Sequence, residues 1–189
     1  MPRLLTVSGS LRAGSSNAVL LSAVERLGPA DVVVSAYTGV AALPAFNPDV
    51  EESESPLPEP VTQWRAAIAD ADAVLISSPE YVHGIPGSLK NALDWIVGGS
   101  EIVGKPVGVL SASAASRFAH PQLVEVLRTM SANVVPEATV VIDIPRRGVD
   151  VEQLVNDAGM SARLRAVTSA LLASLATQNA GSRLVRTLG

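Results

Sequence analysis

The sequence predicts an α/β protein built on a doubly wound, five-stranded parallel sheet. Short aliphatic runs, rich in β-branched residues, alternate along the chain with longer segments whose apolar residues recur at helical spacing. The composition, 48% apolar and 17% charged, suits a sheet that is buried on both faces. Regular alternation of strand and helix implies parallel strands with helices on both faces, joined by right-handed crossovers. The 189 residues fit a single domain, 1–189.

The strands are expected where short aliphatic runs are bounded by turn residues or by a helical segment. Between them, apolar residues three and four apart predict amphipathic helices. The first helix is followed by Gly28 and Pro29, which are typical of a helix end, and His120 before Pro121 marks the start of another. The predicted strands are residues 4–8, 32–36, 73–77, 107–111 and 140–144. The predicted apolar stripes are Leu20, Val24, Leu27; Leu89, Ala92, Leu93, Ile96; Leu123, Val126, Leu127, Met130; and Leu164, Val167, Leu171, Leu175.

Two segments lack this periodicity. Residues 43–60 carry five prolines and five acidic residues and are expected to form a long solvated loop after the second strand. We interpret this loop as a connector, the alternative being a contact with substrate or a second subunit. Residues 178–189 are expected to form a flexible tail.

Composition excludes several classes of site and partner. The chain has no cysteine, which excludes disulfides, thiolate nucleophiles and cysteine-bound zinc or iron–sulfur clusters. Its two histidines, His83 and His120, show no metal-ligand spacing, so no metal is expected. A formal net charge of -4 argues against nucleic acid and anionic membranes as partners. No apolar stretch reaches the ~18 residues of a membrane span or resembles a signal peptide, so a cytoplasmic location is expected.

Residues 9–17, GSLRAGSSN, lie between the first predicted strand and the first predicted helix. Unpaired backbone N–H groups and the helix dipole converge at such a turn, which is therefore typical of an anion site. The glycines permit a tight backbone path, the serine hydroxyls can donate to phosphate oxygens, and the arginine adds a charge-assisted contact. The candidate ligands are Ser10, Arg12, Ser15 and Ser16.

The residues missing from this loop limit the kind of phosphate. Gly9 and Gly14 have the spacing of a Walker loop, but Ser15 replaces its lysine, which disfavours ATP and GTP. The dinucleotide pattern G-x-G-x-x-G is absent too, so a terminal monophosphate remains. The alternative is an ordinary turn in which Ser15 or Ser16 caps the helix.

Residues 77–95, SSPEYVHGIPGSLKNALDW, follow the third predicted strand and so lie at the same edge of the sheet. Their prolines and glycines fix a backbone suited to presenting N–H and C=O groups to a flat heterocycle. Tyr81 can stack on such a ring or form a wall. We expect Lys90, Asn91 and Asp94 to organise the junction between loop and helix, and Trp95 to pack in the core or at an interface.

The segments GSLRAGSSN and PEYVHGIPGSLKNALDW resemble the two motifs of the NAD(P)H-dependent FMN reductase family of flavodoxin-like proteins. The resemblance covers most of the chain and implies a three-layer, flavodoxin-like fold with strand order 2-1-3-4-5. It implies non-covalently bound FMN, with NADPH or NADH as electron donor and FMN, a quinone or a similar small molecule as acceptor. It also implies a homodimer or homotetramer.

By the same resemblance, the phosphate of FMN would lie in the first loop and its ring against the second, with Ser111 beginning a third wall that extends to Ser116. Many members have asparagine where this chain has Val82, so a side-chain hydrogen bond at that position is lost. No protein side chain is expected to be catalytic, because the chemistry takes place on flavin N5; Glu80 is expected to serve through its backbone. The expected cofactor-binding residues are Ser10, Arg12, Ser15, Ser16, Asn17, Pro79, Glu80, Tyr81, Val82, His83 and Ser111.

Two other functions stay open at this point. The chain could be an electron carrier that holds FMN without reacting directly with NAD(P)H, although carriers tend to be more acidic and to sandwich the ring between aromatic residues. It could also be a scaffold that has kept the fold and lost the flavin, which only Val82 suggests. Arg117 is a candidate for recognising the 2′-phosphate of NADPH.

Overall fold

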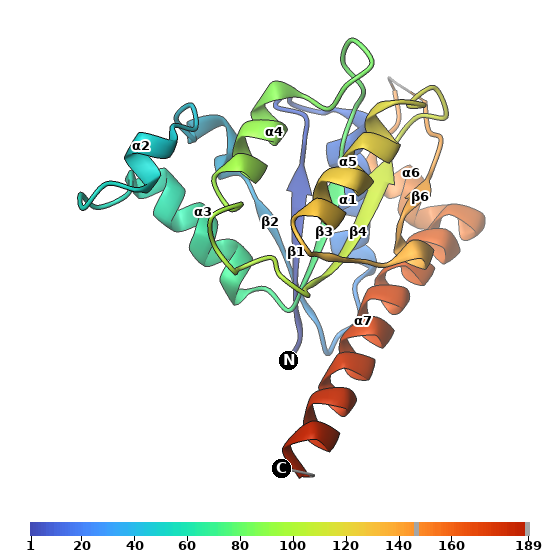
Figure 1. The fold of residues 1–189 in the computed structure, drawn as a ribbon. Helices are drawn as coiled ribbons and strands as arrows, with labels where there is room; N and C mark the ends of the chain where they lie inside the picture. The colour runs from blue at the N-terminus through green and yellow to red at the C-terminus, as the bar shows by residue number, and fades with distance from the viewer. Residues whose placement is uncertain (146–147, 188–189) are drawn as a thin grey trace.

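The computed structural model describes residues 1–145 and 148–187, with side chains up to Gln178, and confirms the predicted α/β fold (Figure 1). All paired strands are parallel, in the order β2-β1-β3-β4-β5, as the sequence predicts. The strands are β1 Arg3–Ser8, β2 Val33–Tyr37, β3 Ala73–Ser77, β4 Pro106–Ser111, β5 Asn133–Val134 and β6 Val140–Val141. The helices are α1 Ser16–Leu27, η1 Gly39–Ala42, α2 Pro48–Glu51, α3 Glu59–Asp70, α4 Gly87–Asp94, α5 Ala119–Thr129, η2 Pro136–Ala138, α6 Val151–Asn156 and α7 Ala158–Thr187.

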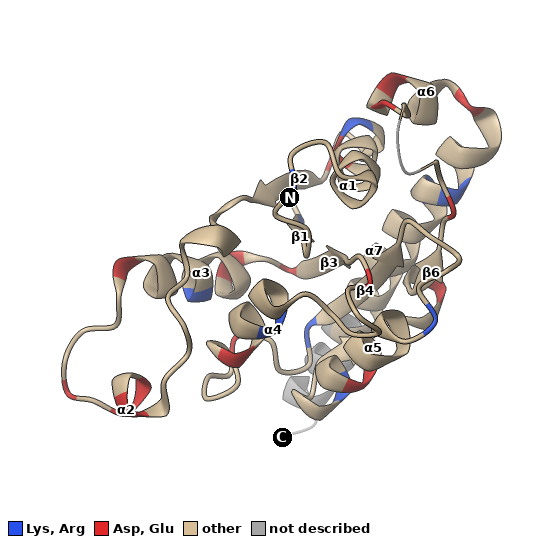
Figure 2. Cartoon of the chain, turned by 90° about the horizontal axis from the view of Figure 1, so that it is seen from above, with Lys and Arg blue, Asp and Glu red and all other residues tan. Residues whose placement is uncertain are grey.

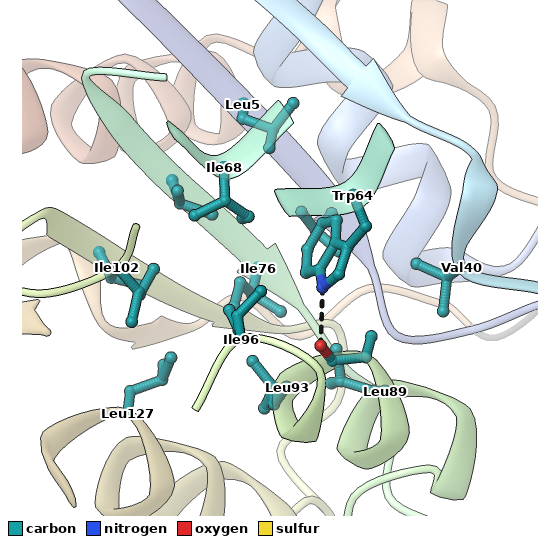
Figure 3. Packing of buried hydrophobic residues seen from close by; sticks show 14 of the residues in the cluster. Leu5, Val40, Trp64, Ile68, Ile76, Leu89, Leu93, Ile96, Ile102 and Leu127 are labelled. Atoms are coloured by element: carbon teal, nitrogen blue, oxygen red, sulfur yellow. Dashed lines mark hydrogen bonds between the residues drawn. The ribbon is translucent and has the colours of Figure 1, made fainter. Parts of the chain in front are cut away.

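Alternate residues of the central strands point to opposite faces of the sheet and build two hydrophobic cores. Helices α3, α4 and α5 cover one face, and α1, α6 and α7 cover the other. Strand β3 shows the alternation clearly, because Val74 and Ile76 belong to the first core while Ala73 and Leu75 belong to the second. In the first core the fully buried Trp64 also donates from Nε1 to the Ala92 carbonyl at 2.7 Å (Figure 3). This bond fixes α3 against α4.

The fifth position of the sheet differs from the prediction of one strand over 140–144. Two short strands share it: β5 pairs with the start of β4, and β6 pairs with its end. Pro136 has no N–H to donate, and between the two strands the chain makes the turn η2 toward β4. Gly108 of β4 makes room for this turn, because a Cβ there would lie 2.8 Å from the Ala138 carbonyl oxygen.

Two smaller differences concern the edge strand and the loop after it. Strand β2 begins one residue later than predicted, since the N–H of Val32 still belongs to a turn closed on the Pro29 carbonyl. The loop predicted over 43–60 contains the one-turn helix α2, because Asn47 caps it and Pro48 occupies its first position. Its acidic residues lie along the outer segment around α2 (red in Figure 2).

This loop is also attached to α4, which sequence reasoning missed. Asn91 accepts from the Phe46 N–H at 2.7 Å and donates to the Pro44 carbonyl at 2.8 Å. Trp95, buried as expected, donates to the same carbonyl at 2.8 Å, and Phe46 packs edge-on against it. Asn91 therefore anchors a distant loop rather than the start of its own helix.

The predicted tail falls only partly within the described residues. The α7 backbone runs through to Thr187, whereas residues 188–189 and the side chains from 179 onward lie outside the described part of the chain.

Replacing Gly108 with alanine is expected to lower the free energy of unfolding by about 1–3 kcal/mol, because the new methyl group meets the backbone of Ala138. Urea unfolding of the variant measures the loss. Gly87→Ala is the matched control, since a Cβ at Gly87 has no heavy atom within 4 Å. Equal stability of wild type and Gly108→Ala would contradict this account of the split strand.

Candidate functional site

The loops that follow β1, β3 and β4 meet at the carboxyl edge of the sheet, at the top of Figure 1. They enclose a cavity of about 380 Å³ at the point where the strand order reverses, which is where α/β sheets bind ligands. Nine of the eleven predicted site residues line it: Ser10, Arg12, Ser15, Ser16, Asn17, Pro79, Glu80, Tyr81 and Ser111. Ala112, Ser113, Ala115 and Ser116 complete the lining.

Asn17, in the first turn of α1, holds the three loops together. Its side-chain oxygen accepts from the Ser77 hydroxyl at 2.8 Å and from the Ala112 N–H at 3.3 Å. All three residues are buried. Because Oδ1 is engaged in this way, the group that Asn17 can offer to a ligand in the cavity is its Nδ2 amide.

The first loop contributes free hydrogen-bond donors to the lining of the cavity. Ser15 caps α1 by accepting from the Ala18 N–H at 3.1 Å, and the Ser10 hydroxyl accepts from the Arg12 N–H at 3.3 Å. Both hydroxyls therefore have a hydrogen left to donate. Ser16 differs, because its hydroxyl already donates to the Pro145 carbonyl at 3.1 Å, which leaves its backbone N–H for a ligand.

This donor set fits a phosphate group. Residues 9–17 contain no carboxylate, α1 has no acidic residue in its first turn, and the exposed Arg12 supplies a positive charge. Gly14 adopts φ = 65°, in the left-handed region, as the tight path of the loop requires. The helix-capping alternative for Ser15 is correct. It is compatible with the phosphate prediction, since one hydroxyl can accept from the helix and donate to an anion.

The second loop forms a short hairpin beside the cavity. Tyr81 and Gly84 exchange backbone hydrogen bonds of 2.9 and 3.0 Å, and the two residues between them, Val82 and His83, have φ of 50° and 59°. Positive φ at both positions is the type I′ pattern, which favours asparagine and glycine. A β-branched residue there is strained by about 1–2 kcal/mol. Val82 is fully exposed and, like His83, lies outside the cavity lining.

The Glu80 carboxylate reaches across to the start of α5. Its Oε2 accepts from the N–H groups of Ala119 and Phe118 at 2.8 and 2.7 Å. These two bonds lower the pKa of Glu80 below its ordinary value. The carboxylate therefore stays ionised at neutral pH, and its contribution to stability is lost only as the pH falls through that lowered pKa.

The third wall, residues 111–116, is fixed by hydrogen bonds within itself and to the segment after β6. The Ser111 hydroxyl donates to the Ser113 carbonyl at 3.2 Å, so it is engaged within its own loop. Asp143, which sequence reasoning missed, accepts from the Ala114 N–H at 2.8 Å. Asp143 was hard to predict from the sequence, because it is a lone aspartate near the end of the fifth strand with no motif around it.

No group of three or more His, Cys, Asp or Glu residues in the described part is placed to hold a metal ion. None of the helices described has the length and apolar character needed to cross a membrane.

The sheet order, the cavity at the strand reversal and the phosphate-type loop define a flavodoxin-like protein. More narrowly, the chain belongs to the NADPH-dependent FMN reductase family, whose profile matches residues 2–145. This confirms the resemblance noted in the sequence.

Individual relatives agree with this assignment. The chain is 35% identical over 113 residues to a quinone reductase of Escherichia coli, covering 59% of this chain and 60% of that protein. It is 37% identical over 114 residues to an NAD(P)H-dependent FMN reductase of Pseudomonas aeruginosa, with coverages of 59% and 60%. The aligned part thus spans about 60% of the length of either relative. FerB of Paracoccus denitrificans, a flavoenzyme NAD(P)H:acceptor oxidoreductase, superposes with a TM-score of 0.73 at 25% identity, over 94% of this chain and 98% of its own.

Replacing Asn17 with alanine is expected to lower the free energy of unfolding by about 2–3 kcal/mol, because the Ser77 hydroxyl and the Ala112 N–H are left buried without a partner. Denaturant unfolding checks this value. Asn133→Ala serves as control, since its amide makes one half-buried bond to Ser174 and should cost less. Similar losses in the two variants would show that Asn17 does not join the loops.

Proposed function

We propose that this protein is an FMN-dependent oxidoreductase that uses NADPH or NADH to reduce FMN, a quinone or a similar small acceptor. The observation that carries the proposal is the cavity at the strand reversal, whose lining combines the free donors of the first loop with the base of the hairpin. The family assignment and the named activities of the relatives support the same conclusion.

The residues present fit FMN. We assign its phosphate to the hydroxyls of Ser10 and Ser15, the Arg12 guanidinium and the backbone N–H groups that begin α1. We assign its ring to the wall formed by Pro79, Glu80 and Tyr81, with residues 111–116 opposite. Val82 and His83 stand at the hairpin tip beside this site.

The redox chemistry would be supplied by bound FMN, which can accept hydride from a nicotinamide and give electrons to an acceptor. The chain's task is to bind, orient and enclose. The Glu80 carboxylate accepts two backbone hydrogen bonds on Oε2, and these lower its pKa, so it is a poor proton donor at neutral pH. This supports the view that no protein side chain needs to exchange a proton with the substrate.

The first test is a visible absorption spectrum of the purified protein with added FMN, followed by anaerobic NADH and then NADPH. We expect bound flavin that bleaches rapidly with at least one nucleotide. Bound flavin that bleaches with neither would indicate the electron carrier, and a protein that binds no flavin would overturn the proposal.

Arg12→Ala is expected to weaken FMN binding roughly tenfold, because a charge-assisted contact to phosphate is lost. Fluorescence quenching of FMN on titration gives the affinity. Arg128→Ala, an arginine on α5 outside the cavity lining, is the control and should leave the affinity unchanged. The same FMN affinity in wild type and Arg12→Ala would show that Arg12 does not bind the phosphate.

The cytoplasmic location and the homodimer or homotetramer stay predictions. Exposed Val97 and Val103, beside a groove between α4 and α5, favour self-association. Light scattering of the purified protein should give twice or four times the chain mass; a monomer would contradict this.

A further inference from the structure

Helix α5 begins without a cap of its own. The residue at its N-cap position is Phe118, whose side chain cannot accept a hydrogen bond. The first N–H groups of a helix need acceptors, and here Glu80 supplies one to both Phe118 and Ala119 from a loop 38 residues away in sequence. The negative charge also suits the positive end of the helix dipole.

Two further contacts join the hairpin to the same helix. Gln122, one turn into α5, accepts from the Ile85 N–H at 2.9 Å. The His83 ring stacks on Phe118 with centroids 4.3 Å apart and planes 25° from parallel. The helix itself is fixed to the core by the fully buried Leu123 and Leu127. The hairpin is thus fastened to a rigid element.

Glu80 also acts on the opposite wall of the cavity, because residues 111–116 lead directly into α5. The first half of that wall has its own attachments, through Ala112 to Asn17 and through Ala114 to Asp143. Where the wall joins α5, the N–H groups of Ser116 and Arg117 donate within the wall, to the Ser113 and Ala115 carbonyls. The next two N–H groups, those of Phe118 and Ala119, donate to the Glu80 carboxylate. One side chain therefore spans from the hairpin wall to the end of the third wall.

We propose that Glu80 is a positioning residue whose carboxylate, by capping α5, holds two walls of the cavity at a fixed separation and so sets the affinity for FMN. This inference rests on the proposed function in one respect, that FMN is the ligand of the cavity. The carboxylate acts through the helix and makes no contact with the cofactor. Walls that are ordered before binding lose less conformational entropy when FMN binds, so the entropic cost of binding is lower.

The experiment compares wild type with Glu80→Ala, Glu80→Gln and the control Asp157→Ala. Asp157 is a carboxylate cap of the same kind, accepting from the Met160 N–H at 2.7 Å at the start of α7, outside the cavity lining. Two quantities are measured: FMN affinity by fluorescence quenching, and hydrogen exchange of the Phe118 and Ala119 amides without FMN.

We expect Glu80→Ala to bind FMN roughly tenfold more weakly and to exchange both amides faster. Glu80→Gln keeps an oxygen that can accept, so it should recover most of the affinity. Asp157→Ala should lose stability without losing affinity.

Unchanged affinity in Glu80→Ala would overturn the proposal, as would Glu80→Gln binding as weakly as Glu80→Ala. An equal loss of affinity in Asp157→Ala would also overturn it, because the effect would then reflect general destabilisation. If wild type itself binds no FMN, the proposed function fails instead, while the exchange data still test the cap.

Discussion

A buried amide, that of Asn17, connects the chain segments that meet at the carboxyl edge of the sheet. Parallel strands end at one edge, but nothing in the sheet itself fixes how the loops beyond them are arranged. By accepting from Ser77 and Ala112, Asn17 links the first turn of α1 to the ends of β3 and β4. The free donors of Ser10 and Ser15 then face the same cavity as the hairpin wall.

Among the helices that begin at this edge, α1 and α5 flank the cavity and differ in how their N-termini are used. The first turn of α1 has no acidic residue and keeps unused hydrogen-bond donors, so an external anion can occupy it. The first turn of α5 is already occupied by a carboxylate of the chain. The open donors at the start of α1 can hold a single phosphate group, which agrees with a mononucleotide cofactor.

The sequence was sufficient for the parallel sheet and the two loops through local periodicity and motifs, and for the sheet order and most of the cavity lining through its resemblance to the reductase family. It was insufficient where distant segments decide the outcome. The fifth strand is interrupted because Pro136 lacks a donor and Gly108, on another strand, leaves space for a turn. The roles of Asn91 and Glu80 depend on partners at Phe46 and Phe118, to which no spacing in the sequence points.

The hairpin is attached through its base and flank: backbone bonds between Tyr81 and Gly84, the Glu80 carboxylate, and the bond from Ile85 to Gln122. The side chain of Val82 at its tip is fully exposed. Substitution at the tip can therefore change what meets an incoming molecule without disturbing the fold. Position 82 is therefore a place where the side chain can vary while the core and the cavity lining stay as they are.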